Sequence, residues 1–219
     1  MAAWANAEAR MFVVIFQVRP KADRWDAYLG YAALLRPEIV KIDGFIDNVR
    51  YASKRRPGLI LSLSTWRDEK SLIRWRTHAL HTEVQGKGRD EVFEDYHLCV
   101  GEVTADSAPP PGHAVREQRL DETEEGAAKA VALIETAGMA ADFPSRAGEP
   151  GLVDHDVFEA ILTPGAYLVM LSWRDAAAAA RCVSPAGARH RTVRVVRDYG
   201  MFRRGEAPRY YPDIPKPLS

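Results

Sequence analysis

Apolar and polar residues near the start of the chain follow two different periods. Residues 11–19 are apolar on both alternating faces, with Phe12 on one face and Val13 on the other. A strand of this kind is covered on both sides, as when helices pack on one face of its sheet and a second sheet packs on the other. From about Lys21 to Val40 the apolar residues recur at helical spacing instead, which predicts a helix.

The same two periods, together with turns at Asp43-Gly44 and Pro57-Gly58, predict the rest of a first module. Its further elements are a strand over 45–52, a strand over 59–65, a helix over about 68–85 and a strand over 96–103. The order is therefore β-α-β-β-α-β, which is the ferredoxin-like arrangement.

A repeat indicates that this module occurs twice. The segment Pro57–Asp68 aligns without a gap with Pro164–Asp175, and both begin with Pro-Gly and end with Trp-Arg-Asp. Each segment is predicted to be a turn, a buried strand and the start of a helix, with the aspartate at the helix N-terminus. We expect the two modules to face each other within one chain.

The second half of the chain is predicted as a shorter copy. We divide the chain into a module over 1–106, a Pro-rich linker over 107–112 and a degenerate second module with a C-terminal tail over 113–219. The pattern predicts the following elements in the second module: a short strand near 114–119, a helix within 122–138, strands near 157–162 and 166–172, a short helix over 176–181 and a strand over 192–198. Because the second helix of this copy is short, the larger pocket should lie in the first module.

Composition excludes several classes of function. Thirty basic residues balance thirty acidic ones, so no excess of positive charge favours binding to a nucleic acid. No long apolar span and no basic leader followed by an apolar run is present, so we expect a cytoplasmic protein that does not enter a membrane. The two cysteines, Cys99 and Cys182, have no metal-ligand spacing, and no metal site is predicted.

Three segments of the first module resemble the antibiotic biosynthesis monooxygenase family: Thr65–Asp68, Arg74–His81 and Asp95–Val103. The resemblance covers residues 11–106 well and 155–200 more loosely. It implies an α+β fold in which two ferredoxin-like modules pair sheet to sheet into a dimeric, here pseudo-dimeric, α/β barrel. The family includes cofactor-free oxygenases of aromatic compounds, haem-degrading enzymes and quinol-type oxygenases, so the site has to decide the chemistry.

The resemblance also implies what a haem-degrading member would need: an asparagine on the first strand, a tryptophan on the second helix and an iron-binding histidine about three turns further on. This chain has Gln17, Trp75 and Gln85 at the nearest positions. The tryptophan is retained, but an amide is a poor axial ligand for iron. Haem degradation would then require His78 or His81 to bind the iron from an earlier turn.

Four polar residues of the predicted second helix, Arg74, His78, His81 and Gln85, fall on one helical stripe. This stripe is either the wall of a pocket or a face exposed to solvent, because the opposite arc is apolar. His78 lies nearer to Trp75 on the helical wheel and is the candidate general base. Trp75 itself either packs in the core or stacks on a ligand.

Three further polar residues lie in predicted strands. Gln17 stands in an apolar strand and Asn48 and Arg50 in the next one, so each either meets a structural partner or lines a pocket. We assign His78, Trp75 and Gln17 as candidate catalytic residues. Arg74, His81, Asn48 and Arg50 are the candidate substrate-binding residues.

These residues permit a cofactor-independent monooxygenase that acts on an aromatic phenol, anthrone or quinol-like molecule and on dioxygen. A deprotonated, electron-rich substrate can reduce dioxygen itself, so that the protein supplies a dry pocket, a base and a donor for the developing oxyanion. Two alternatives are a haem-binding or haem-degrading protein and a non-catalytic barrel that binds a hydrophobic ligand. No cofactor is expected, with haem or a reduced flavin as the alternatives, and the protein is either a monomeric pseudo-dimer or a homodimer.

Overall fold

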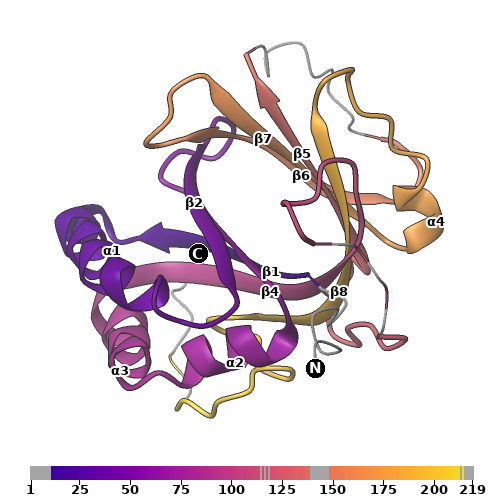
Figure 1. Cartoon of the computed structure of the whole chain (residues 1–219). Coiled ribbons are helices and arrows are strands. Elements are labelled where there is room, and N and C mark those ends of the chain that lie inside the picture. The colour runs from indigo at the N-terminus through magenta and orange to yellow at the C-terminus, as the bar shows by residue number, and fades with distance from the viewer. Residues whose placement is uncertain are drawn as a thin grey trace, which may run out of the picture.

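The computed structural model describes residues 11–113, 115, 117, 119–138, 148–212 and 214. Its strands close into one barrel in the order β1-β3-β2-β6-β7-β5-β8-β4 (Figure 1). The elements are β1 (Phe12–Pro20), η1 (Ala22–Arg24), α1 (Trp25–Ile39), β2 (Phe45–Ser53), β3 (Ile60–Trp66), α2 (Glu69–Thr77), α3 (Ala79–Lys87), η2 (Gly88–Val92), β4 (Phe93–Asp106), β5 (Ala130–Ala137), β6 (Leu152–Ala160), β7 (Ala166–Trp173), α4 (Ala176–Ala179) and β8 (Arg189–Gly200).

The barrel consists of two four-stranded halves from one chain, as the repeat predicted. Strands β1–β4 form one half and β5–β8 form the other, and all neighbouring strands are antiparallel. Along one seam β4 pairs with β8 from His97 to Asp106, whereas along the other β2 pairs with β6 from Tyr51 to Ser53. The exact boundaries of the two modules and of the linker stay a prediction.

Both faces of the sheet are covered, which explains why β1 is apolar at successive positions. Alternate residues point to opposite faces of a strand. Val13 and Ile15 therefore pack inside the barrel with Leu61, Leu133 and Phe158 of other strands. The residues between them face the helices outside, where α1, α2 and α3 cover the first half and α4 lies beside the second (Figure 1).

The repeat is preserved in the detail of its turns. Asp68 caps α2 by accepting a hydrogen bond from the Ser71 backbone N–H, and Asp175 caps α4 by accepting one from Ala178, each at 2.7 Å. These caps confirm the helix N-termini predicted from the Trp-Arg-Asp sequence.

One sequence prediction in the second half is wrong. The expected helix over 122–138 is replaced by β5, which runs between β7 and β8. The alanines of this segment favour a helix locally, but Ala130 and Ala132 pack on α4 while Val131 and Leu133 pack inside the barrel. Burial on both faces of a sheet outweighs that local preference.

The expected strand near 114–119 is also not observed. Residues 115, 117 and 119 belong to no strand, and 114, 116 and 118 lie outside the described residues. Strands β4 and β8 run longer than predicted, because each continues along the other at the seam between the two halves.

The predicted helix over 68–85 is interrupted. His78 has an extended backbone, with φ −61° and ψ 131°, so that α2 ends at Thr77 and α3 begins at Ala79. The single stripe of Arg74, His78, His81 and Gln85 therefore does not form, since residues on the two sides of a break do not share one helical face. No helix in the described part of the chain is long and apolar enough to cross a membrane.

Candidate active site

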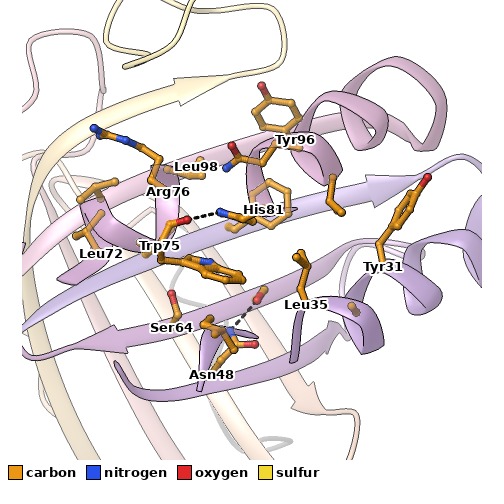
Figure 2. A pocket seen from close by; sticks show the side chains of 18 of the residues that line it. Tyr31, Leu35, Asn48, Ser64, Leu72, Trp75, Arg76, His81, Tyr96 and Leu98 are labelled. Atoms are coloured by element: carbon orange, nitrogen blue, oxygen red, sulfur yellow. Dashed lines mark hydrogen bonds between the residues drawn. The ribbon is translucent and has the colours of Figure 1, made fainter. Parts of the chain in front are cut away.

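A cavity of about 220 Å³ lies in the first module, between the helices and the outer face of β1–β4 (Figure 2). Every second residue of a strand points to the outer face, and these residues form the apolar floor of the cavity: Val14 and Phe16 of β1 and Leu98 and Val100 of β4. Helix α1 contributes Leu35, and the segment after β8 contributes polar residues at one side. In the second module Trp173 packs against the short helix α4 on the outer face of the sheet.

The break between α2 and α3 places two aromatic rings against each other. The ring of His81 stacks on Trp75 with 4.2 Å between centroids and 14° between planes. His81 Nδ1 also lies 2.9 Å from the Trp75 carbonyl oxygen (Figure 2). Because a carbonyl can only accept, Nδ1 carries the proton and donates it, which leaves Nε2 of a neutral ring as an acceptor for a ligand.

Burial decides the charge of His81. It lowers the pKa of His81 from 6.5 to about 4, while the hydrogen bond to the Trp75 carbonyl opposes this shift and the nearby positive charge of Arg209 adds to it. His81 is therefore uncharged at neutral pH. Its Nε2 can accept a hydrogen bond from a substrate hydroxyl and so orient it. As a base it is weak, because efficient proton abstraction near pH 7 requires a pKa near that value.

Two polar side chains on the floor present partly used groups. The Asn48 amide N–H₂ donates to Ser62 Oγ at 2.9 Å and to the Leu63 carbonyl at 3.3 Å. These bonds hold the Asn48 side chain in place and leave its amide oxygen as an acceptor. Arg50 lies beside Tyr28. Burial raises the pKa of Tyr28, and the positive charge of Arg50 offsets only part of that rise. The Arg50 Nε is buried without a hydrogen-bond partner in the described structure.

Positive charge gathers at this cavity without a matching carboxylate. Among the described residues that line it there are six arginines and neither Asp nor Glu: Arg36, Arg50, Arg76, Arg197, Arg204 and Arg209. An excess of cations beside apolar walls favours a ligand with an apolar body and an anionic group.

Two of the lining arginines, Arg204 and Arg209, follow β8 and bond neutral partners. Arg204 donates to Tyr96 Oη at 2.6 Å and to the Arg209 carbonyl at 2.8 Å. Arg209 in turn donates to Gln85 Oε1 at 3.2 Å and to Thr82 Oγ1 at 3.0 Å on α3. These bonds draw the segment after β8 against α3 and leave both guanidinium charges free to attract an anion.

The predicted site residues separate into two groups. Trp75, His81, Asn48 and Arg50 line the cavity, whereas Gln17, Arg74 and His78 are not among its lining residues. The cavity thus brings together residues from α2, α3 and β2, as the sequence predicted for part of the set.

The other three residues have different surroundings. Gln17 is buried on the interior face of β1, across the sheet from the cavity. Arg74 reaches away to Asp43, donating to its carbonyl at 3.0 Å. His78 sits at the break between the helices with its ring 5.6 Å from that of Trp75 and its Nδ1 buried without a hydrogen-bond partner in the described structure. Their positions give no support to direct roles in this cavity, and His81 takes the place predicted for His78.

Sequence reasoning missed the contribution of the C-terminal segment. Tyr199, Arg204, Arg209 and Tyr211 line the cavity although they are distant in sequence from the other lining residues. The available signal was the density of arginine and tyrosine between residues 197 and 211, but nothing in that pattern indicated which surface the segment would contact.

Comparison with known proteins agrees with this architecture. Residues 11–87 match the model of the antibiotic biosynthesis monooxygenase family. The chain is also 48% identical over 216 residues to "Jasmonate monooxygenase ABM" of Pyricularia oryzae, covering 92% of this chain and 99% of that protein. The chain belongs to the antibiotic biosynthesis monooxygenase family. It is accordingly a monooxygenase-type oxidoreductase.

Solved structures share the fold at low sequence identity. A crystal structure of aldoxime dehydratase is 11% identical, with a TM-score of 0.51 and coverage of 89% of this chain and 83% of that one. The aldoxime dehydratase OxdRE in complex with butyraldoxime is 13% identical, with a TM-score of 0.50 and coverage of 89% and 81%. At these identities the likeness concerns the barrel and carries no information on the reaction.

Proposed function

We propose that this monooxygenase acts on a small, apolar carboxylic acid of the jasmonate type. The observation that carries the proposal is the cavity with apolar walls and six arginines but no carboxylate among its described lining residues. The family relative named for jasmonate, the anion of an apolar carboxylic acid, supports the same class of substrate. A volume of about 220 Å³ suits one small molecule, since cavities for drug-sized ligands span roughly 300–1,000 Å³.

Each part of the cavity has a task in this proposal. Arg204 and Arg209 hold the carboxylate. Among the described residues, both side chains hydrogen-bond neutral groups, so that no protein carboxylate neutralises their charges. The apolar floor and Trp75 hold the hydrocarbon body and exclude water from the reacting atoms. His81 Nε2 accepts a hydrogen bond from the substrate or holds a transferred proton.

The reaction must balance in oxygen and electrons. One atom of dioxygen enters the substrate and the other leaves as water, which consumes two protons and two electrons when the product is an alcohol. We propose that the electrons come from a two-electron donor in solution, such as a reduced flavin, because a histidine with a pKa of about 4 is a poor base for generating a substrate carbanion.

An electron-rich aromatic substrate is the second candidate. Aromatic side chains line much of the cavity, including Tyr28, Tyr31, Trp75 and Tyr96, and rings of this kind stack on flat ligands. A phenol or anthrone would supply its own electrons, so that no added reductant would be needed.

Haem fits the cavity poorly. A haem macrocycle is larger than a drug-sized ligand, and drug-sized ligands already occupy larger cavities than this one. In addition, the position implied for an iron-binding histidine holds Gln85, whose amide oxygen accepts a hydrogen bond from Arg209. We therefore derive no step through haem.

Oxygen consumption and product mass decide between these candidates. Jasmonic acid, its methyl ester, an anthrone and a hydroquinone are offered to the chelator-treated protein under ¹⁸O₂, with and without reduced flavin. We expect one labelled oxygen atom in the acid product and a much higher KM for the uncharged ester. Turnover of the aromatic compounds alone would favour the second candidate. Binding without turnover would indicate a non-catalytic barrel, and a Soret band on haemin titration would overturn our rejection of haem.

A further inference from the structure

A second polar cluster lies across the sheet from the cavity. His97 and Cys99 are on β4, and Asp198 is on β8 directly opposite Cys99. Tyr96 and Leu98 line the cavity, so the alternation of β4 directs His97 and Cys99 to the interior of the barrel. The Cys99 and Asp198 side chains are buried, while that of His97 remains 43% exposed.

A bulge in β8 brings Asp198 to this side. Val195 pairs with Gly101 and Arg197 pairs with Val100, so Val196 is an extra residue in the ladder. An extra residue reverses the alternation beyond it. Val195 therefore packs inside the barrel before the bulge, and Asp198 faces the interior after it.

Each of the three side chains offers one ligand-type atom, and these atoms lie within 4.8 Å of one another, close enough to surround one metal ion. Cys99 Sγ lies 3.7 Å from His97 Nε2 and 3.4 Å from Asp198 Oδ2, and His97 Nε2 lies 2.8 Å from Asp198 Oδ1. Ordinary zinc bond lengths at tetrahedral angles place sulfur and nitrogen about 3.5 Å apart, sulfur and oxygen about 3.6 Å apart, and nitrogen and oxygen about 3.4 Å apart. The distances from Cys99 Sγ to His97 Nε2 and to Asp198 Oδ2 are close to these values. The shorter contact of His97 is with the other oxygen, Asp198 Oδ1, and is a hydrogen bond that an ion would replace.

We propose that His97, Cys99 and Asp198 form a binding site for a divalent transition-metal ion of the Zn²⁺ class. One nitrogen, one sulfur and one carboxylate oxygen are the donor types that Zn²⁺ takes, and three protein ligands leave a fourth position open. His97 provides the route of entry because it is the exposed member of the three.

Gln17 faces the same space. It pairs with His97 in the ladder between β1 and β4 and is buried. Side chains of directly opposite residues lie close together on one face of a sheet, so the Gln17 amide oxygen is a candidate for the fourth position. This site gives the polar residue in an otherwise apolar strand a role that the cavity does not.

The charges of the cluster allow a cation to replace protons. Burial raises the pKa of the Cys99 thiol well above its ordinary value, with the Asp198 charge adding to this effect, so the metal-free site holds a thiol rather than a thiolate. A bound divalent ion would displace that proton, and the thiolate and carboxylate together would neutralise the ion.

Arg203 must move for the ion to bind. It donates to Asp198 Oδ1 at 2.6 Å, but its side chain is 51% exposed and can turn to solvent. The carboxylate of Glu206, which accepts a hydrogen bond from the Asp198 backbone N–H at 2.6 Å, keeps negative charge near the site.

Cobalt(II) provides a direct test on tag-free, metal-free full-length protein. We expect a sulfur-to-cobalt charge-transfer band on titration, displaced by Zn²⁺, together with a rise in Tm on adding Zn²⁺. In Cys99→Ser the band should disappear, whereas Cys182→Ser, which changes the other cysteine, should retain it. His97→Ala changes a half-exposed residue, so the variant should fold, and it should bind cobalt about 100-fold more weakly or worse.

The outcomes that would overturn the site are equally definite. No charge-transfer band in the wild-type protein would refute it, as would a band that persists in Cys99→Ser or an unchanged cobalt affinity in His97→Ala. Because none of these readouts uses substrate turnover, the result is independent of the proposed oxidation of a carboxylic acid.

Discussion

His81 lies flat on Trp75, with 4.2 Å between ring centroids, and its Nδ1 donates to the carbonyl of the same residue. The contact exists because His78 breaks the helix between them. The tryptophan and the histidine thus form one rigid wall of the cavity, in which the ring of Trp75 fixes the plane of the imidazole and its carbonyl fixes the tautomer.

The first prediction concerns the role of His81 in turnover. His81→Phe keeps a flat ring on Trp75 but removes the acceptor at Nε2, so kcat/KM should fall by about 10- to 100-fold, which is the effect of losing a hydrogen bond worth roughly 1–3 kcal/mol. His78→Ala, at the helix break and outside the cavity lining, should retain most of the activity. Steady-state kinetics under air measure both variants, and equal losses would argue against His81 as the acting group.

The second prediction concerns the effect of pH on stability. Because the pKa of His81 is lowered from 6.5 to about 4 on folding, the unfolded chain binds this proton more readily than the folded protein between these values. The contribution is therefore complete above pH 6.5 and is lost as the pH falls toward 4, with a slope of at most about 1.4 kcal/mol per pH unit. Urea midpoints measured from pH 4.5 to 7 should fall less steeply for His81→Phe than for the wild type, and parallel curves would contradict the shift.

The third prediction concerns recognition of the carboxylate. Arg209→Met removes a cavity charge that bonds neutral groups of α3, so KM for the acid should rise by about 10- to 100-fold, in keeping with roughly 1.5–3 kcal/mol for a hydrogen bond to a charged group. Arg74→Met, which changes an arginine bound to Asp43 outside the lining residues, is the matched control. The effect should vanish for the methyl ester, and a similar loss with acid and ester would indicate a purely structural role for Arg209.

The fourth prediction concerns the seam between β2 and β6. Arg56 Nε bonds Asp156 Oδ2 at 2.7 Å, and the Asp156 side chain is fully buried. Arg56→Leu should lower the free energy of unfolding by roughly 1–3 kcal/mol, because it removes a partner from a buried carboxylate. Lys54→Met breaks the nearby pair with Glu159 and should lower the stability clearly less, because water and salt screen an exposed ion pair. Denaturant unfolding compares the two, and reversed magnitudes would show that the buried carboxylate is satisfied without Arg56.

The fifth prediction concerns the turn before β2. Gly44 has φ +86°, and a Cβ there would collide with the side chain of Ser71 at the start of α2. Gly58 has a similar φ of +77° but open space around it. Gly44→Ala should therefore destabilise the protein clearly more than Gly58→Ala, which bears only the left-handed backbone cost of about 1–2 kcal/mol. Thermal unfolding of the two variants checks the order.

A good part of this structure could be predicted from the chain alone. The alternation around Val13 and the repeated Pro-Gly and Trp-Arg-Asp elements are local signals, and they predicted most of the strands, the caps at Asp68 and Asp175 and two facing modules in one chain. The closed barrel was what the family resemblance implied. Helical position left Trp75 either in the core or at a ligand, and the family resemblance made it a candidate site residue; in the structure it lines the cavity.

Other features depended on contacts between distant segments. The alanine-rich segment of β5 carries a helical preference that is overruled by neighbours on both faces of the sheet. The bulge at Val196 turns Asp198 toward Cys99, and hydrogen bonds from Arg209 draw the C-terminal segment over the cavity.

The division follows the range of the forces involved. Sequence determined what each segment prefers on its own, because propensity, alternation and capping act over a few residues. The tertiary structure decided which histidine faces the cavity, where the arginines gather and which polar groups meet inside the barrel, because burial and pairing depend on partners more than a hundred residues away.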